Sequence, residues 1–120
     1  MKKWVLVFVC AAAAIVLVTD RMDASAADVD AGKEKYRQFC VSCHGQKGKG
    51  DGPSSHMLNP KPRDYTETRY MKSLSDEHIF KVIKLGGAGV GKSFSMPPWG
   101  SRLSDEDIKN IVAFIRTLSK

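Results

Sequence analysis

Two cysteines and a histidine occupy five consecutive positions, Cys40-Val41-Ser42-Cys43-His44. Thiols three positions apart can add to the two vinyl groups along one edge of a haem, and the imidazole that follows can reach the iron as an axial ligand. The pentapeptide therefore predicts one haem c, bound covalently through Cys40 and Cys43, with His44 as a ligand of its iron.

Three other kinds of site share part of this pattern. A thioredoxin-like redox pair requires a βαβ unit nearby, and no strand-like run precedes Cys40. Cys40, Cys43 and His56 match three ligands of a zinc finger, but the fourth is due at positions 60–62, which hold Pro, Lys and Pro. A disulfide across so short a loop would restrain little of the unfolded chain. Haem attachment is therefore the favoured interpretation.

The first 26 residues have the pattern of a secretory signal peptide. Lys2 and Lys3 precede an uninterrupted apolar run over residues 4–18, and Ala24-Ser25-Ala26 supplies a cleavage pattern. We expect residues 27–120 to form one domain in the periplasm, where haem can be joined to reduced thiols. The alternative is an uncleaved anchor that holds the domain on the periplasmic face of a membrane, although the apolar run is shorter than the ~20 residues of a spanning helix.

Three segments have the pattern of helices: about residues 30–40, 75–85 and 104–118. Ser75 and Ser104 suit the N-cap position and are followed by acidic residues in the first turn, while Gly86-Gly87 ends the second segment. Apolar residues recur at helical spacing in the second and third segments, and no segment alternates as a strand. The sequence predicts an all-α fold of three main helices whose long loops surround a cofactor.

Residues 86–93, Gly-Gly-Ala-Gly-Val-Gly-Lys-Ser, match the phosphate-binding P-loop pattern. That site needs a strand before the loop and a helix after it. Here a helix is predicted before the loop, and Pro97-Pro98 follow closely after it. We therefore expect no nucleotide at this loop, and interpret it as a flexible connector that brings Met96 to the haem.

A second iron ligand would decide between electron transfer and the binding of small molecules. Met96 is favoured because it lies in a proline-rich loop before the last predicted helix, and two prolines would hold its thioether in place. The other candidates are Met57, Met71, His56 and His78. If both axial positions are filled, dioxygen and peroxide find no open position. If Met96 does not bind the iron, a haem enzyme or gas sensor stays possible.

The basic residues of the chain are spread along it. The 120 residues have a formal net charge of +6, but no basic stripe with interleaved aromatic residues is present, which argues against a nucleic-acid partner. The scattered lysines are either a solvated surface or a field that attracts an acidic redox partner to the haem edge.

These features resemble class I cytochrome c over essentially the whole of residues 27–120. The matching positions are Gly32, Tyr36, Cys40, Cys43 and His44 near the start, Met96-Pro97-Pro98 in the loop, and residues 111–115 in the last helix. The resemblance implies the cytochrome c fold around a single haem with one exposed edge. It also implies a carrier of single electrons and not an enzyme.

The resemblance further assigns roles around the haem. Gly52-Pro53 is similar to the family's Gly-Pro, in which the proline carbonyl accepts the hydrogen bond of the proximal histidine Nδ1–H. Pro60 is the alternative acceptor. The segment between the haem motif and Ser75 is longer than in the smallest members of the family, so the resemblance does not assign the partners of the haem propionates; the candidates are Arg63, Tyr65, Tyr70 and Trp99.

The sequence as a whole predicts a monohaem c-type cytochrome that carries electrons between redox partners outside the cytoplasm. Its iron would have His44 and Met96 as axial ligands, and its partner would present an acidic docking face. The alternative is a haem subunit of a membrane oxidoreductase complex, anchored by an uncleaved N-terminal helix.

Overall fold

Helices make up all the regular structure between residues 26 and 120, which is the part of the chain that the computed structural model describes. The α-helices are α1 (Val29–Phe39), α2 (Val41–His44), α3 (Thr68–Ser73), α4 (Asp76–Leu85) and α5 (Asp105–Leu118), with short 3-10 helices at Ser55–Met57 and Ala88–Val90. The predicted all-α fold is confirmed, and the three predicted helices correspond to α1, α4 and α5. The signal peptide predicted over residues 1–26 lies almost wholly outside the described residues.

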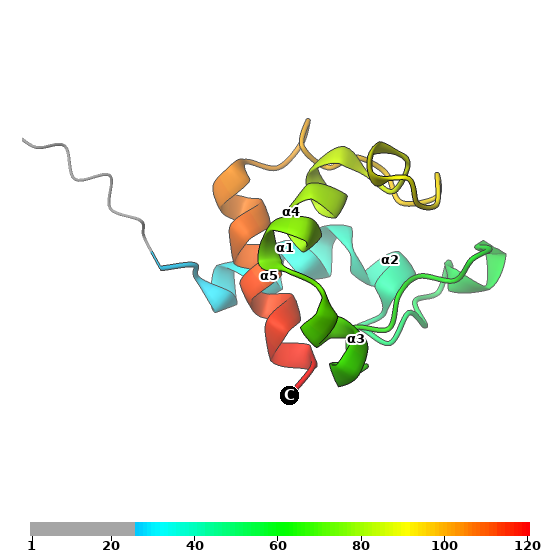
Figure 1. Ribbon diagram of the computed structural model, residues 1–120, viewed down its shortest axis with the longest axis horizontal. Helices are drawn as coiled ribbons and strands as arrows, with labels where there is room; N and C mark the ends of the chain where they lie inside the picture. Colours follow the sequence, from blue (N-terminus) through cyan, green and yellow to red (C-terminus); the bar gives the residue numbers. More distant parts are fainter. Residues whose placement is uncertain (1–25) are drawn as a thin grey trace, which may run out of the picture.

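The contact between α1 and α5 brings together the two ends of the described chain (Figure 1). Gly32 makes this close crossing possible, because a Cβ atom there would lie 1.9 Å from the carbonyl oxygen of Asn110. One turn further along α1, the ring of Tyr36 packs on that of Phe114 with 5.1 Å between centroids. The side chain of Asn110 also accepts a hydrogen bond from the backbone amide of Asp28, just before α1.

Serine caps begin both of the other long helices. The Ser75 hydroxyl accepts from the amide of His78 at the start of α4. At the start of α5, Ser104 and Asp107 form a reciprocal capping box. These caps satisfy backbone amides that a helix leaves without partners, which explains why the two helix starts were readable from the sequence.

Arg116 joins the C-terminal half of α5 to α3 and α4. Its guanidinium donates to the carbonyl oxygens of Met71 (2.6 Å) and Leu74 (2.5 Å), and its Nε lies 2.6 Å from the carboxylate of Asp76. The same side chain thus holds the end of α3 and the start of α4, which follow one another around a central cavity.

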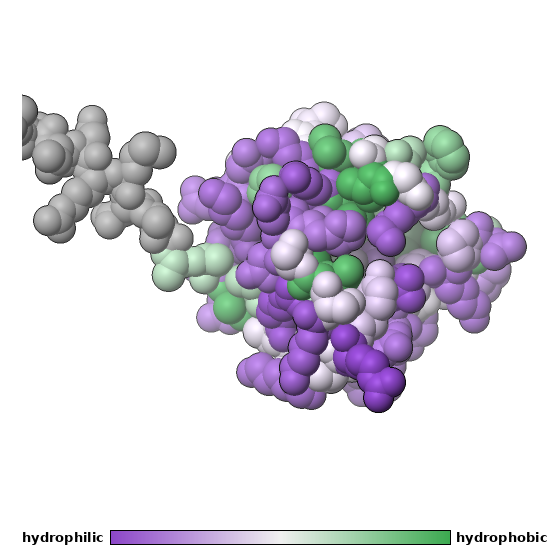
Figure 2. All heavy atoms as spheres, in the orientation of Figure 1, coloured by the Kyte–Doolittle hydropathy of each residue, from purple (hydrophilic) through white to green (hydrophobic). Residues whose placement is uncertain are grey.

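The hydrophobic core is formed mainly by α1, α4 and α5. Its buried members are Tyr36, Cys40, Met71, Ile79, Ile83, Leu103, Ile108, Ile111, Val112, Phe114 and Ile115. Figure 2 shows a mostly hydrophilic face on which hydrophobic side chains gather in the upper part, over the end of α4 and the loop that follows. Within residues 26–120, no helix is both long and apolar enough to cross a membrane.

Candidate haem site

The two thiols and the imidazole are held by one continuous helical turn. Cys40 ends α1, where its amide donates to the carbonyl of Tyr36 (2.9 Å), and the amide of His44 donates back to the carbonyl of Cys40 (2.8 Å). The Tyr36 hydroxyl donates to the carbonyl of Gly45 (2.7 Å), which ties the residue after His44 to α1. Both cysteines are free; Cys40 is buried and Cys43 is half-buried. Burial raises the pKa of the Cys40 thiol to about 12, and the neighbouring Cys43 adds to this shift.

Both ring nitrogens of His44 have partners. Nδ1 lies 3.3 Å from the carbonyl oxygen of Arg63, and Nε2 lies 3.2 Å from the hydroxyl of Tyr65, whose ring stacks on the imidazole at 4.6 Å. A carbonyl can only accept, so Nδ1 carries the proton and Nε2 presents its lone pair. Burial lowers the pKa of His44, while the bond to the Arg63 carbonyl opposes this shift. A neutral imidazole with Nε2 free of its proton is the form that binds a metal.

The acceptor for His44 Nδ1 differs from the one expected by family resemblance. Pro53 was predicted to supply the carbonyl, with Pro60 as the alternative, but in the structure the acceptor is Arg63. The amides on either side of Pro53 donate to carbonyl oxygens within α2 (3.1 and 2.8 Å), which holds this segment against the helix backbone. Pro53 is exposed and does not line the cavity beside His44, so its predicted role is not seen in this structure.

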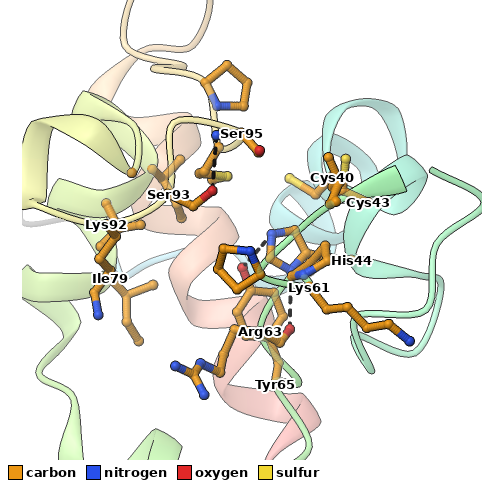
Figure 3. A pocket seen from close by; sticks show the side chains of 18 of the residues that line it. Cys40, Cys43, His44, Lys61, Arg63, Tyr65, Ile79, Lys92, Ser93 and Ser95 are labelled. Carbon is orange, nitrogen blue, oxygen red and sulfur yellow. Dashed lines mark hydrogen bonds between the residues drawn. The ribbon is translucent and has the colours of Figure 1, made fainter. Parts of the chain in front are cut away.

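A cavity of about 570 Å³ lies beside α2, within the usual range for cofactor and small-molecule sites. Cys40, Cys43 and His44 line one side, and α3 and α4 contribute a largely apolar wall that includes Met71 and Ile79. Figure 3 shows Lys92, Ser93 and Ser95 facing the cysteines and His44 across the cavity. Met96, next in the chain, also lines it.

The cavity has a polar region away from the two thiols. Figure 3 shows Arg63 and Tyr65 at the lower end, with the cysteines at the upper right. The Arg63 guanidinium lies 4.0 Å above the ring of Tyr70, and burial keeps the pKa of Tyr65 well above its ordinary value, so its hydroxyl stays a donor. Lys61 and Lys92 line the cavity at other places on its wall, and the described lining residues include no aspartate or glutamate.

The surroundings of this cavity fit a haem c. Two thiols and an imidazole line one side, apolar side chains of α3 and α4 line another, and the Arg63 guanidinium lies at the end away from the thiols, with no carboxylate among the described lining residues. A haem has the same distribution, with vinyl groups along one edge, an apolar macrocycle and two carboxylates along the opposite side.

The structure sorts the candidate ligands into two groups. Met96, Met71 and His78 line the cavity with His44. Met57 is 71% exposed, and His56 is also exposed; neither lines it. The Arg63 carbonyl was missed by sequence reasoning, and no side-chain signal could have found it because a backbone acceptor is independent of residue type.

Comparison with known proteins places this site in a family. The family model described as "Cytochrome C oxidase, cbb3-type, subunit III" matches residues 27–115. The chain is 35% identical over 98 residues to cytochrome c-554(547) of Halothiobacillus neapolitanus, covering 78% of this chain and 99% of the relative. It is 28% identical to the cbb3-type cytochrome c oxidase subunit FixPc of Rhizobium leguminosarum bv. viciae, covering 74% of this chain but only 27% of that subunit.

Solved structures agree with the sequence relatives. The structure of the KustC0563 c-type cytochrome has a TM-score of 0.61 and 26% identity, covering 74% of this chain and 98% of the other. A chain of the Kuenenia stuttgartiensis reducing HAO-like protein complex Kustc0457/Kustc0458 has a TM-score of 0.62 and 29% identity, covering 77% and 43% respectively. This chain therefore belongs to the c-type cytochromes, within the family described as cytochrome C oxidase, cbb3-type, subunit III, and Cys40 and Cys43 are its attachment points for haem c.

Proposed function

We propose that this chain is an exported carrier of single electrons whose haem iron has His44 and Met96 as axial ligands. The observation that carries the proposal is that α2, with its two thiols and imidazole, and the loop that holds Met96 line the same cavity from facing sides. Haem c, when bound, supplies an iron that gains or loses one electron without a change of ligands.

The chain's own residues set the conditions for that chemistry. The Arg63 carbonyl fixes the His44 ring with Nε2 available, which also strengthens the imidazole as a donor. Ligation through Nε2 takes up the lone pair that now faces Tyr65, so we expect the Tyr65 hydroxyl to be released. With Arg63, Tyr70 and Trp99, it would then be a donor to the haem propionates. A neutral thioether from Met96 would favour ferrous iron and raise the potential.

Met96 is preferred over Met71 for the second ligand. Met71 lies on α3 with none of its surface exposed and belongs to the hydrophobic core, which is the usual setting of a packing methionine. Met96 lies outside any helix, is only half-buried and precedes two prolines. A loop can bring a thioether over the iron without moving the core.

The partner and the compartment follow from charge and from the N-terminal pattern. Lys61, Arg63 and Lys92 border the cavity, which supports an acidic docking face on the redox partner. We place the protein in the periplasm after cleavage of residues 1–26. The second candidate is a haem subunit of a membrane oxidoreductase complex, anchored by the uncleaved segment. The observation in support of this second candidate is the match to the cbb3-type family and to FixPc.

Absorption spectra and carbon monoxide binding test the ligand assignment. We expect the ferric protein to show a methionine–iron charge-transfer band and the ferrous protein not to bind carbon monoxide. Met96→Ala should lose the band and bind the gas. Met71→Leu is the matched control, which changes another methionine that lines the cavity and should retain both properties. The reverse result for these two variants would overturn the assignment. Mass spectrometry of the exported protein, which gives its N-terminal residue and the mass of one haem, separates the free carrier from the anchored subunit.

A further inference from the structure

The glycine-rich segment 86–93 closes on itself by backbone hydrogen bonds. The amide of Lys92 donates to the carbonyl of Gly87 (2.7 Å), and the amides of Val90 and Gly91 each donate to the carbonyl three residues earlier (both 3.2 Å). Several amides that would bind phosphate in a P-loop are therefore already used inside the loop. The flexible connector expected from the glycine content is in fact a hydrogen-bonded turn around the 3-10 helix Ala88–Val90.

Gly87 connects this turn to the segment that carries Met96. Its amide donates to the carbonyl oxygen of Met96 (2.9 Å), while its own carbonyl accepts from Lys92. Both polar groups of its backbone are thus engaged, one with the turn and one with Met96. Figure 3 shows Lys92, Ser93 and Ser95 on the side of the cavity that faces His44.

The absence of a side chain at position 87 is required by this arrangement. A Cβ atom at Gly87 would lie 1.9 Å from the carbonyl oxygen of Ser93, three residues before Met96. The preceding Gly86 has φ of 75° and also abuts the Met96 carbonyl. Ordinary contact distances begin near 3.4 Å, so a methyl group at position 87 must displace the Ser93 carbonyl by roughly 1.5 Å. The obstacle is backbone and cannot rotate away as a side chain would.

We propose that Gly87 is a positioning residue for the axial ligand: its amide holds the Met96 carbonyl, and its lack of a side chain lets residues 93–96 lie against the end of α4 with the thioether directed into the cavity. The inference rests on the proposed function, because it concerns how the second ligand is held. The P-loop-like residues thus serve the iron site through hydrogen bonds to backbone and not through phosphate binding.

Two substitutions by alanine in the same loop test this role. Gly87→Ala meets the Ser93 carbonyl, whereas Gly91→Ala, whose φ is 71°, is strained but meets nothing within 4 Å. Gly91→Ala therefore controls for weakening of the loop without displacement of Met96. In the ferric haem-loaded protein, we expect Gly87→Ala to bind added imidazole about tenfold more tightly than wild type and to have a lower reduction potential. Gly91→Ala should stay within about twofold of wild type in imidazole affinity.

Equal effects of the two variants, or none in either, would overturn the role of Gly87. Should Gly87→Ala fail to fold, hydrogen exchange of the wild-type protein tests the same role. Imidazole that displaces Met96 from the iron should accelerate exchange of the Gly87 amide, and the imidazole concentration at the midpoint should equal that of the spectral change. An unchanged exchange rate of the Gly87 amide would refute the coupling between Gly87 and Met96. Failure of the proposed function looks different. In that case the wild-type spectrum lacks the methionine–iron band, or Met96→Ala retains it.

Discussion

Replacing Gly32 with alanine sets two effects on stability against each other. Gly32 lies within α1, where alanine is the better helix former by about 1 kcal/mol. Helix propensity alone therefore predicts that Gly32→Ala raises the free energy of unfolding. The contact with α5 predicts the opposite, since the added carbon would lie 1.9 Å from the carbonyl oxygen of Asn110.

The size of the effect follows from what surrounds position 32. The next nearest atoms are the Asn110 carbonyl carbon at 2.4 Å and the Ile111 nitrogen at 2.9 Å, both of them backbone. The two helices must therefore separate by roughly 1.5 Å, which forfeits much of the dispersion energy across their interface. The Tyr36–Phe114 ring pair, one turn along, shares that interface. Overpacking costs about 1–3 kcal/mol, and with both neighbours fixed we expect the upper end, or a net loss of about 2 kcal/mol after the gain in propensity.

Urea and thermal unfolding of the haem-loaded protein measure this loss. A change of about 2 kcal/mol corresponds to a decrease in Tm of about 8–16 °C for a domain of this size. Lys33→Ala, at the next and exposed position of α1, is the control and should change stability by less than about 0.5 kcal/mol. An unchanged or raised Tm in Gly32→Ala would show that the α1–α5 contact is not as close as the structure has it.

Two further changes test how the haem site and its support hold the domain together. In Cys40→Ala/Cys43→Ala, which cannot retain haem covalently, the apolar side chains that line the cavity of about 570 Å³ would be left open to water, and a small domain has only about 5–15 kcal/mol of stability in total. We therefore expect the far-ultraviolet circular dichroism of the haem-free variant to lose most of its helical signal, and a native-like helical spectrum would contradict this. Arg116→Ala removes a charged donor from two carbonyl oxygens and should lower the free energy of unfolding by about 2–3 kcal/mol. Arg116→Lys should recover only part of this loss, because lysine keeps the charge but lacks the planar fork of donors. Urea unfolding measures the stability of both variants, and stabilities equal to that of the wild type would contradict the role of Arg116.

Local signals were sufficient for some helices and not for others. Ser75 and Ser104 predict the starts of α4 and α5, because a hydroxyl that caps a helix accepts a hydrogen bond from the amide three residues later. The short helix α3 has no side-chain cap at Glu67, and it is held by Arg116, more than forty residues later in the chain. A helix that is stabilised by a residue so distant in the sequence cannot be predicted from its own residues alone.

In the candidate site, too, the features set by neighbouring residues were predictable and those set by distant residues were not. The thiols and imidazole are adjacent in the chain, so their types and spacing are enough to predict the attachment of haem. The partner of His44 Nδ1 was assigned to Pro53 by resemblance, whereas the structure uses the carbonyl of Arg63. Every residue has a carbonyl, and which one reaches the imidazole depends on the path of the loop between α2 and α3.

The glycine loop shows why residue types alone do not decide chemistry. Glycines leave amides accessible to a phosphate, but the same freedom lets the amides bond to nearby carbonyls. In this chain the amides of Gly87 and Lys92 bond to the carbonyls of Met96 and Gly87, so the acceptors are supplied by the loop itself and by the residue it positions. A P-loop directs its amides outward because a strand and a helix fix its two ends. Here the loop instead runs from the end of α4 into the Met96 segment, so a phosphate-like pattern forms part of the support for the residue that we propose as the second iron ligand.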